Sequence, residues 1–540
     1  MKRRDFLAAS LCAPMLACTA KTEPPLPPGS SDGSGAELGH RLRGEALAAP
    51  VEVRRVPLLL VGAGIAGLSA AWKLQRAGFE DFLVLDLESR PGGNARYGAN
   101  AISAYPLGAH YLPLPTREAT ATRELLADLG ALQGDARAPQ PTYEERLLCH
   151  VPQERLYIDG VWQEGLLPRL GVGGAEAEQL RRFLQAMGEW REARDTEGRR
   201  AFALPVAWSS PRAEWRALDR LSMRDWLLAK GYTAPQLHWY VNYACRDDYG
   251  SDYRHTSAWA SIHYFACRNG AAANAASDAV LTAPAGNGWI VEALARRLGP
   301  RLQTQALVFR LSQTRRSVMA DVWLAAEKRA VRYVADQAIW CAPLFALARL
   351  GVDLPAALAQ AARAGSYAPW LVANLSLAEA PAPGAGAPLS WDNVLYAGAG
   401  LGYVVATHQQ MQLRPGPTVL TYYRACSEVA PQLARQTLLG STREQHAAAI
   451  LEELGRAHAD LRRLTTRLDI VRHGHAMIRP TPGSLWGAPR QALSTAWGRV
   501  HLAHADLSGL SLFEEANYHG VAAAEAVLSR LRIAYATSLQ

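Results

Sequence analysis

The sequence predicts an α/β protein that contains a doubly wound nucleotide-binding domain and a second, α+β domain. Two observations predict this class. A short apolar strand, a glycine-rich turn, an amphipathic helix and a second strand follow one another between residues 56 and 86. The chain is also 540 residues long, more than one hydrophobic core usually supports, so two domains or one interleaved pair are expected.

The N-terminus has the features of an export signal. Three bases at positions 2–4 precede an apolar run, 6–17, that is too short to cross about 30 Å of hydrocarbon as a helix. The letters RRDFL resemble a twin-arginine signal, whose route carries folded proteins, and MLAC resembles a bacterial lipobox ending at Cys18. We therefore predict a removable signal peptide over 1–17, a periplasmic protein anchored to the membrane through lipidated Cys18, and a disordered tether over 18–55. The alternative is an ordinary basic N-terminus before a buried helix.

Composition excludes several classes of protein. The hydrophobic content is 49% without a run of eighteen apolar residues, as in a globular body. The net charge of +8 falls to +6 when three bases and one acid of residues 1–17 are removed, and the excess is scattered. We therefore expect no nucleic-acid partner. Beyond Cys18 there are five cysteines without a Cys-x-x-Cys spacing, so neither structural disulfides nor a zinc site is expected.

The glycine-rich turn has the spacing of a phosphate-binding loop. Residues 56–61 form a continuously apolar run, typical of a strand buried on both faces. Gly62 then suits a tight turn, Gly64 lets a pyrophosphate approach the backbone, and Gly67 permits close packing of helix on strand. Helical periodicity follows over 65–77. The alternative is a glycine-rich turn that binds no ligand.

An acidic residue follows at the distance that nucleotide binding requires. Residues 82–86 form the second strand, and Asp86 stands about twenty residues beyond the glycines, where a carboxylate accepts ribose hydroxyls. Ala66, in the first turn of the helix, is also assigned to the cofactor. Strand, glycines, helix, strand and acid in this order predict a dinucleotide site.

The residues after Asp86 indicate which dinucleotide is bound. Asp86 to Gly93 read DLESRPGG and resemble the acid-x-x-x-Arg-x-Gly-Gly segment of the flavin-containing amine oxidase superfamily. The resemblance implies FAD, held in a Rossmann-like domain, with Asp86 on the adenosine ribose. It also implies that Arg90, Gly92 and Gly93 lie along the pyrophosphate.

Further segments are similar to the same superfamily in the same order. Residues 105–112, YPLGAHYL, resemble the segment that passes over the flavin ring, which implies close approach at Gly108 and Ala109. Residues 283–350 resemble the return into the FAD domain, which implies that Val308 backs the adenine.

The C-terminal part resembles the signature that closes the FAD domain. The resemblance implies a strand ending at Asp506 and a helix starting under the flavin at Glu515 and Ala516. The N-terminus of such a helix would stabilise the anionic reduced ring through its dipole. The expected division is an FAD-binding domain over 56–112, 283–350 and 490–540 and a substrate domain over 113–282 and 351–489.

Candidate catalytic residues are His110, Tyr403 and His475. His110 directly follows the expected flavin contact and could orient substrate or accept a proton, with simple packing as the alternative. His473 and His475 would share a face of a strand. No third ligand is placed beside them, so no metal site is expected.

The stretch 242–265 gathers ionisable side chains among aromatic residues. We expect most of them to cap helices and hold a loop, because buried polar groups need partners whether or not they react. These residues are Arg246, Asp247, Asp248, Tyr249, His255 and His263.

One departure concerns the expected reaction. The lysine that amine oxidases commonly hold near flavin N5 has no good match here, and Leu512 stands where they often carry a tyrosine. We predict an FAD-dependent oxidoreductase that takes a hydride from a small organic substrate, favouring an amine, onto flavin N5, with oxygen, a quinone or a carrier protein as acceptor. The alternatives are a desaturase or dehydrogenase of a bulky apolar substrate, and a redox-inactive FAD-containing binding protein.

Overall fold

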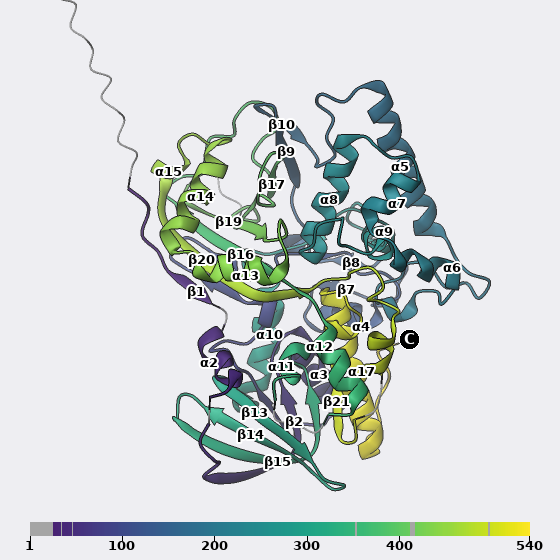
Figure 1. Ribbon diagram of the computed structural model, residues 1–540, viewed down its shortest axis with the longest axis vertical. Helices are drawn as coiled ribbons and strands as arrows, with labels where there is room; N and C mark the ends of the chain where they lie inside the picture. Colours follow the sequence, from purple (N-terminus) through teal and green to yellow (C-terminus); the bar gives the residue numbers. More distant parts are fainter. Residues whose placement is uncertain are drawn as a thin grey trace, which may run out of the picture.

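The computed structural model describes residues 25–33, 35–45, 47–350, 354–410, 416–494 and 497–539. The expected signal peptide and Cys18 lie outside the described residues. Two sheets with their covering helices form the molecule, one above the other in Figure 1. The expected α/β architecture is confirmed.

The lower sheet in Figure 1 has seven strands and carries the glycine-rich turn. Its strand order is β12-β3-β2-β15-β14-β13, with β21 beside β15. Strands β12, β3, β2, β15 and β21 run parallel, and β13 to β15 form an antiparallel meander. The strands are β2 (Glu52–Val61), β3 (Phe82–Leu85), β12 (Leu302–Gln303), β13 (Ala306–Gln313), β14 (Val318–Leu324), β15 (Arg329–Trp340) and β21 (Val500–Leu502).

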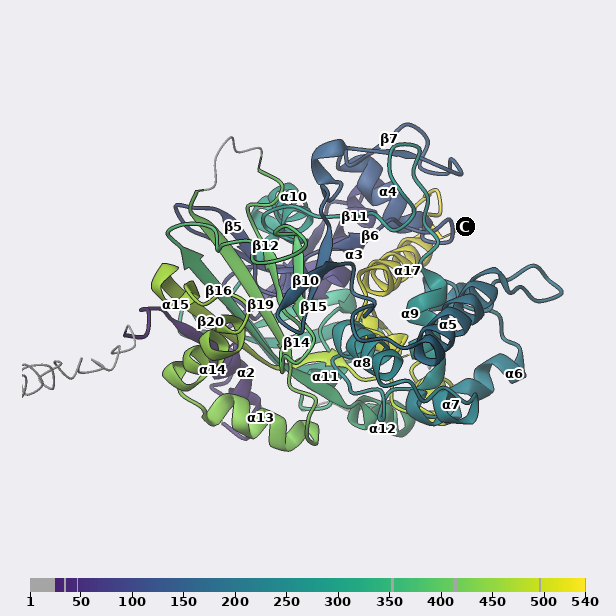
Figure 2. The same ribbon diagram turned by 90° about the horizontal axis from the view of Figure 1, so that it is seen from above.

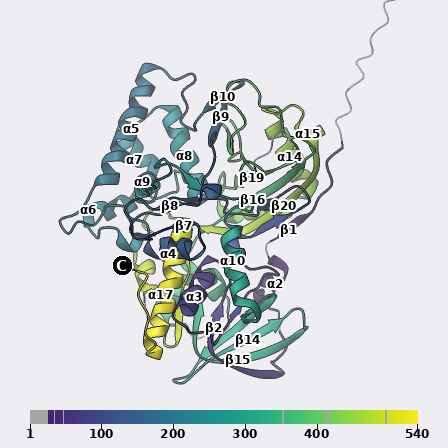
Figure 3. The same ribbon diagram turned by 180° about the vertical axis from the view of Figure 1, so that it is seen from behind.

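Helices cover both faces of this sheet. On one face α3 and α17 lie side by side, with α10 and α4 beside them, as Figure 3 shows from behind. These are α3 (Ile65–Arg76), α4 (Thr120–Asp128), α10 (Gly288–Leu298) and α17 (Phe513–Leu531). The apolar side chains of the other face pack against the short helices α11 (Leu344–Leu347) and α12 (Ala356–Ala364), which contacts α16 (Ala488–Ala492). The two covered faces explain why the central strands are apolar on both sides.

The second sheet has eight strands in the order β1-β20-β16-β19-β18-β17-β9-β10. Its outer face packs against α13, α14 and α15, and its inner face is turned toward the cavity described below. The elements are β1 (Ser31–Gly33), β9 (Glu154–Ile158), β10 (Val161–Glu164), β16 (Tyr367–Leu377), β17 (Asp392–Leu395), β18 (Tyr403–Val405), β19 (Thr418–Ala425), β20 (Thr465–Ile478), α13 (Pro431–Gly440), α14 (Arg443–Gly455) and α15 (Leu461–Leu464).

A helical subdomain stands beside the second sheet, and Figure 2 shows its helices gathered at one side of the molecule. It contains α5 (Gly174–Glu192), α6 (Ala213–Arg216), α7 (Met223–Ala229), α8 (Pro235–Tyr249) and α9 (Ala258–Cys267). Their buried side chains form a separate apolar core. None of the helices in the described part of the chain is long and apolar enough to cross a membrane.

The N-terminal segment corrects one expectation. Residues 25–33 and 35–45, predicted as part of a disordered tether, contain strand β1 and helix α2 (Ala36–His40). β1 pairs in parallel with β20, and the Ser30 backbone amide donates to an Asp469 carboxylate oxygen at 2.8 Å. The low apolar content misled the prediction because edge pairing is stabilised by backbone hydrogen bonds rather than by side-chain burial.

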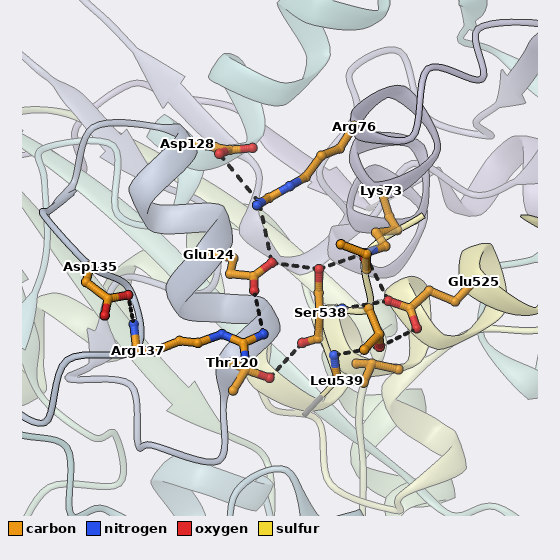
Figure 4. A network of polar contacts seen from close by, with 12 residues as sticks. Lys73, Arg76, Thr120, Glu124, Asp128, Asp135, Arg137, Glu525, Ser538 and Leu539 are labelled. Carbon is orange, nitrogen blue, oxygen red and sulfur yellow. Dashed lines mark hydrogen bonds and ion pairs between the residues drawn. The ribbon is translucent and has the colours of Figure 1, made fainter. Parts of the chain in front are cut away.

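The C-terminal tail is tied to the helices of the nucleotide-binding domain (Figure 4). The Lys73 ammonium lies 3.0 Å from a Glu525 carboxylate oxygen and donates to the Ser538 hydroxyl at 2.7 Å. The Ser538 hydroxyl donates in turn to Glu124 at 2.7 Å, and the Thr120 hydroxyl donates to the Ser538 carbonyl at 2.6 Å. The tail therefore joins α3, α4 and α17.

Candidate functional site

The glycine-rich turn connects β2 to α3 and has the backbone geometry of a phosphate loop. Gly62 adopts φ +108°, in the left-handed region that favours glycine, and its amide donates to the Leu85 carbonyl at 2.7 Å. A Cβ at Gly67 would lie 1.8 Å from the Gly62 carbonyl oxygen, so only glycine permits this approach. Helix α3 begins at Ile65, where its first-turn amides can receive an anion.

Asp86 holds this loop from the end of β3. Its side chain is 6% exposed, and its carboxylate accepts hydrogen bonds from the Ala63 amide at 2.5 Å and the Glu88 amide at 2.8 Å. Burial raises the pKa of Asp86, while the two amides act in the opposite direction. Asp86 therefore both orders the turn and brings a carboxylate to its edge.

The other expected pyrophosphate residues lie against the same turn. Gly64 forms a parallel bridge with Gly92, and a Cβ at Gly93 would lie 3.4 Å from the Gly64 Cα. Arg90 is exposed and makes no hydrogen bond or ion pair with the described residues, so its guanidinium is available to a phosphate. These features together fit a dinucleotide: the glycine-rich turn, the N-terminus of α3, Asp86 and Arg90. We call them the dinucleotide cradle.

Three further expected cofactor residues lie in separate parts of the chain. Ala66 is buried in the first turn of α3, where a Cβ at Gly520 of α17 would lie 2.2 Å from its carbonyl oxygen. Val308 is 5% exposed and lies at a bulge in β13. Gly108 packs so closely on Asn94 that a Cβ would lie 2.2 Å from the Asn94 carbonyl oxygen.

A cavity lies between residues 108–113, the second sheet and the start of α17. Apolar and aromatic side chains of β16, β19 and β20 form one wall, and the start of α17 forms another. Polar groups enter from the end of α8 and from the residues after α9. The residues that line the cavity include Ala109, His110, Asp247, Asp248, Arg268, Trp370, Tyr423, His473, Leu512 and Glu514.

The cavity carries more acidic than basic groups. Burial raises the pKa of Asp247 to about 7 and that of Glu514 to about 7, while Arg268 donates to the Asp248 carboxylate. Burial also lowers the pKa of His110 to about 4 and that of His473 to about 4, so both imidazoles are neutral at pH 7. Three carboxyl groups thus face one guanidinium.

Comparison with known proteins was made at the level of sequence families and of structure. Residues 60–129 match the family model of the NAD(P)-binding Rossmann-like domain. No curated protein sequence matches the chain. A putrescine oxidase bound to putrescine superposes with a TM-score of 0.66 at 16% identity, covering 88% of this chain and 100% of that one. Cyclohexylamine oxidase from Brevibacterium oxydans IH-35A gives 0.62 at 16% identity, covering 88% and 99%.

The chain has the fold of these amine oxidases. A conjugated-linoleic-acid-producing fatty acid isomerase from P. acnes is also similar, with a TM-score of 0.58 at 12% identity, covering 88% of this chain and 98% of that one. The fold therefore occurs in proteins whose substrates differ.

His110 lies in the cavity of this amine oxidase fold, as predicted. Its ring stacks on Tyr423 with centroids 4.4 Å apart, and its carbonyl accepts from the Thr282 hydroxyl at 2.8 Å. The Tyr423 hydroxyl donates to the Gly108 carbonyl at 3.0 Å. His110 therefore forms part of an aromatic wall, and its low pKa makes it a poor proton acceptor at neutral pH.

The structure corrects the other two catalytic candidates. Tyr403 lies on the outer face of the second sheet, where its hydroxyl is 2.6 Å from His458 Nε2, and it does not line the cavity. A bulge separates His475 from His473: residues 473 and 477 of β20 oppose residues 370 and 368 of β16. His473 consequently lines the cavity, while His475 stacks on Phe345 at 4.6 Å.

The C-terminal signature also differs from its expected form. β21 ends at Leu502, and Asp506 lies in a short 3₁₀ turn where its carboxylate accepts from the Leu344 amide at 2.9 Å and the Tyr367 hydroxyl at 2.6 Å. α17 starts at Phe513, near the expected start. The start of this helix, rather than Glu515, borders the cavity.

Glu515 and Ala516 are directed away from the cavity. Glu515 accepts from the Val206 amide at 2.7 Å and from the Ser508 hydroxyl at 2.5 Å, and Ala516 packs into the core of the nucleotide-binding domain. Both residues thus have structural partners, and their expected role beside the cofactor stays a prediction. Burial raises the pKa of Glu515 to about 7.

Several cavity residues carry no motif in the sequence. Arg268, Trp370 and Tyr423 come from three distant segments, and only folding brings them together. Of the stretch 242–265, His263 is buried and bonded to the Ala203 carbonyl at 2.9 Å, as its expected structural role requires. Among the described residues, no three His, Cys, Asp or Glu side chains gather as a metal site.

Proposed function

We propose that this protein is an FAD-dependent oxidoreductase that removes a hydride from the carbon next to the nitrogen of an amine. The dinucleotide cradle and the likeness of the fold to two amine oxidases support the cofactor and the reaction class. The excess of carboxyl groups in the cavity supports the amine and is the observation that carries the proposal.

The charge of the cavity selects a cation. Asp247, Asp248 and Glu514 face the single guanidinium of Arg268, and the neighbouring histidines are neutral at pH 7. An ammonium group is therefore favoured over a carboxylate. The aromatic wall of Trp370 and Tyr423 can hold the carbon chain and attract the cation.

FAD supplies the hydride acceptor when it is bound. The chain itself would orient the substrate along the aromatic wall and exclude water from the reacting carbon. Loss of hydride from a neutral amine would leave a protonated imine, which water hydrolyses to an aldehyde or ketone and a protonated amine or ammonium. Oxygen, a quinone or a carrier protein would accept the electrons.

Anaerobic mixing tests the proposal. The purified protein should contain oxidised flavin, and its visible absorbance should bleach with aliphatic amines, diamines or cyclic amines and remain with the matching alcohols. Asp248→Asn should raise the amine concentration needed for half-bleaching at least tenfold, since it removes a charge from the cavity. Tyr403→Phe, on the outer face of the sheet, serves as the control. A protein that purifies without flavin and cannot be reconstituted contradicts the proposal.

A lipidic substrate is the second candidate. The cavity also contains an apolar surface made by Leu204, Val372, Met477, Leu512 and Phe513, and the fold resembles that of a fatty acid isomerase. A desaturase or dehydrogenase would be bleached by long-chain apolar donors and remain oxidised with every amine. Flavin that no donor bleaches would instead favour a redox-inactive binding protein.

The location of the protein remains a proposal from its sequence. We propose that the twin-arginine route exports it to the periplasm and that lipidated Cys18 anchors it, since a cofactor site assembled from both chain ends must close before transport. Cys18→Ala should move the protein from the membrane to the soluble fraction without loss of flavin. Unchanged fractionation contradicts the anchor and leaves the flavin proposal untouched.

A further inference from the structure

Two adjacent acids in the first turn of α17 have different environments. Glu514 and Glu515 are 3% and 0% exposed, and burial raises the pKa of each to about 7. Glu515 is held by the Val206 amide and the Ser508 hydroxyl. The Glu514 side chain lines the cavity, and its carboxylate accepts a hydrogen bond from its own backbone amide but none from another described residue.

No side chain offsets the desolvation of the Glu514 carboxylate, because its one hydrogen-bond donor is its own backbone amide. The nearest cation, Arg268, donates its guanidinium to Asp248 instead. The other titratable groups that act on Glu514 are Asp248 at the end of α8, Cys267 at the end of α9 and Glu515 on its own helix. Arg268 and the positive N-terminus of α17 favour the ionised form, so Glu514 can exchange a proton near neutral pH.

We propose that Glu514 accepts the proton that an ammonium substrate must lose inside the cavity. This inference rests on the proposed amine oxidation, because a hydride leaves readily only from a neutral amine. One N–H bond of the ammonium group breaks, its proton bonds to a Glu514 carboxylate oxygen, and the electron pair stays on nitrogen. The neutral amine would then be able to lose hydride from its α-carbon when FAD is bound, and Glu514 returns its proton to water after product departs.

Asp247 is the competing acceptor in the same cavity. Its pKa is also about 7, but the Tyr111 hydroxyl lies 3.5 Å from its carboxylate, and Asp248 and Glu154 add negative charge beside it. Asp247 thus already has a side-chain partner, whereas Glu514 is bonded only by its own amide, and this difference assigns the proton transfer to Glu514.

Glu514→Gln tests the inference, with Glu515→Gln and Asp247→Asn as matched controls. In the parent, the anaerobic rate of flavin bleaching at saturating amine should rise with pH through about 7. Glu514→Gln should lose this rise and bleach about 100-fold more slowly. Both controls should keep the rise, whatever they do to the amine concentration that saturates the rate.

A second measurement does not depend on turnover. Infrared difference spectra of the protein without amine, recorded between about pH 8 and about pH 6, should contain the band of a carboxyl group that gains a proton. In Glu514→Gln the intensity of this band should fall by the contribution of one carboxyl group. In Glu515→Gln the part of the band that comes from Glu514 should remain. A Glu514→Gln protein that keeps the pH rise, or an Asp247→Asn protein that loses it, overturns the inference alone. A parent whose flavin no amine bleaches overturns the proposed function as well.

Discussion

Single residues decide how closely the backbones around the dinucleotide site approach. Gly67 lets the α3 backbone meet the turn at Gly62, and Gly520 lets α17 meet Ala66 of the same helix. These contacts bring α17 close to α3, so the start of α17 can border the cavity. The role of Gly67 could be predicted from its spacing in the sequence, whereas the contact between Gly520 and Ala66 could not.

Gly520→Ala is therefore expected to separate α17 from α3. The added Cβ would lie 2.2 Å from the Ala66 carbonyl oxygen, so backbone must shift. We expect a loss of about 1–3 kcal/mol in the free energy of unfolding, measured by urea titration, together with weaker flavin retention. Gly188→Ala, in an exposed turn of α5 with open space around the new Cβ, should be neutral or stabilising by up to about 1 kcal/mol.

Buried neutral histidines predict sensitivity to acid. Burial lowers the pKa of His263 to about 3, against 6.5 in the unfolded chain. Between pH 6.5 and about 3 the unfolded chain binds a proton at His263 that the folded protein does not bind. The free energy of unfolding therefore falls as the pH falls. From pH 7 to pH 5 the parent should lose about 2 kcal/mol more unfolding free energy than His263→Gln. Equal losses would contradict a neutral His263.

At the scale of elements, a bulge and a sheet face decide which side chains reach the cavity. Because side chains alternate along a regular strand, His473 and His475 were expected on one face, but the bulge in β20 separates them. Strand β18 presents Tyr403 to the outer helices rather than to the cavity. A register or a face depends on the neighbouring strand, which local sequence does not identify.

The tail network of Figure 4 belongs to this scale. Lys73→Met leaves the buried carboxylate of Glu525 without its cation, so we expect a loss of about 3–5 kcal/mol in the free energy of unfolding. Lys230→Met, at an exposed end of α7, should change it by less than about 0.5 kcal/mol. Denaturant titration of both variants tests this, and equal losses would show that the tail network contributes nothing.

At the scale of the whole molecule, the N-terminal segment links the two sheets. β1 pairs with β20, while Leu42 packs into the core of the nucleotide-binding domain and the Arg41 guanidinium lies 4.5 Å from the centroid of the Trp323 ring. The segment passes the end of β3, where Gly35 and Gly39 approach Glu88 and Leu87.

Weakening this link should free the segment without unfolding the rest. The double variant Arg41→Ala with Leu42→Ala should be cleaved within residues 35–45 at least tenfold faster by limiting protease, since local opening becomes easier. Flavin should dissociate several-fold faster if the segment helps to close the site. Cleavage at the parental rate would contradict the link.

The nucleotide-binding half of this protein could be predicted from local sequence. Its glycines, Asp86 and the Arg90 to Gly93 run act through nearby backbone, so their order predicts their arrangement. The cavity could not be predicted in this way. Arg268, Trp370, Tyr423 and Glu514 come from separate segments, and their distances depend on sheet register and helix packing. Glu514 borders the cavity instead of the expected Glu515 because helix packing sets which side of α17 faces the cavity. One residue along a helix turns a side chain by about 100°.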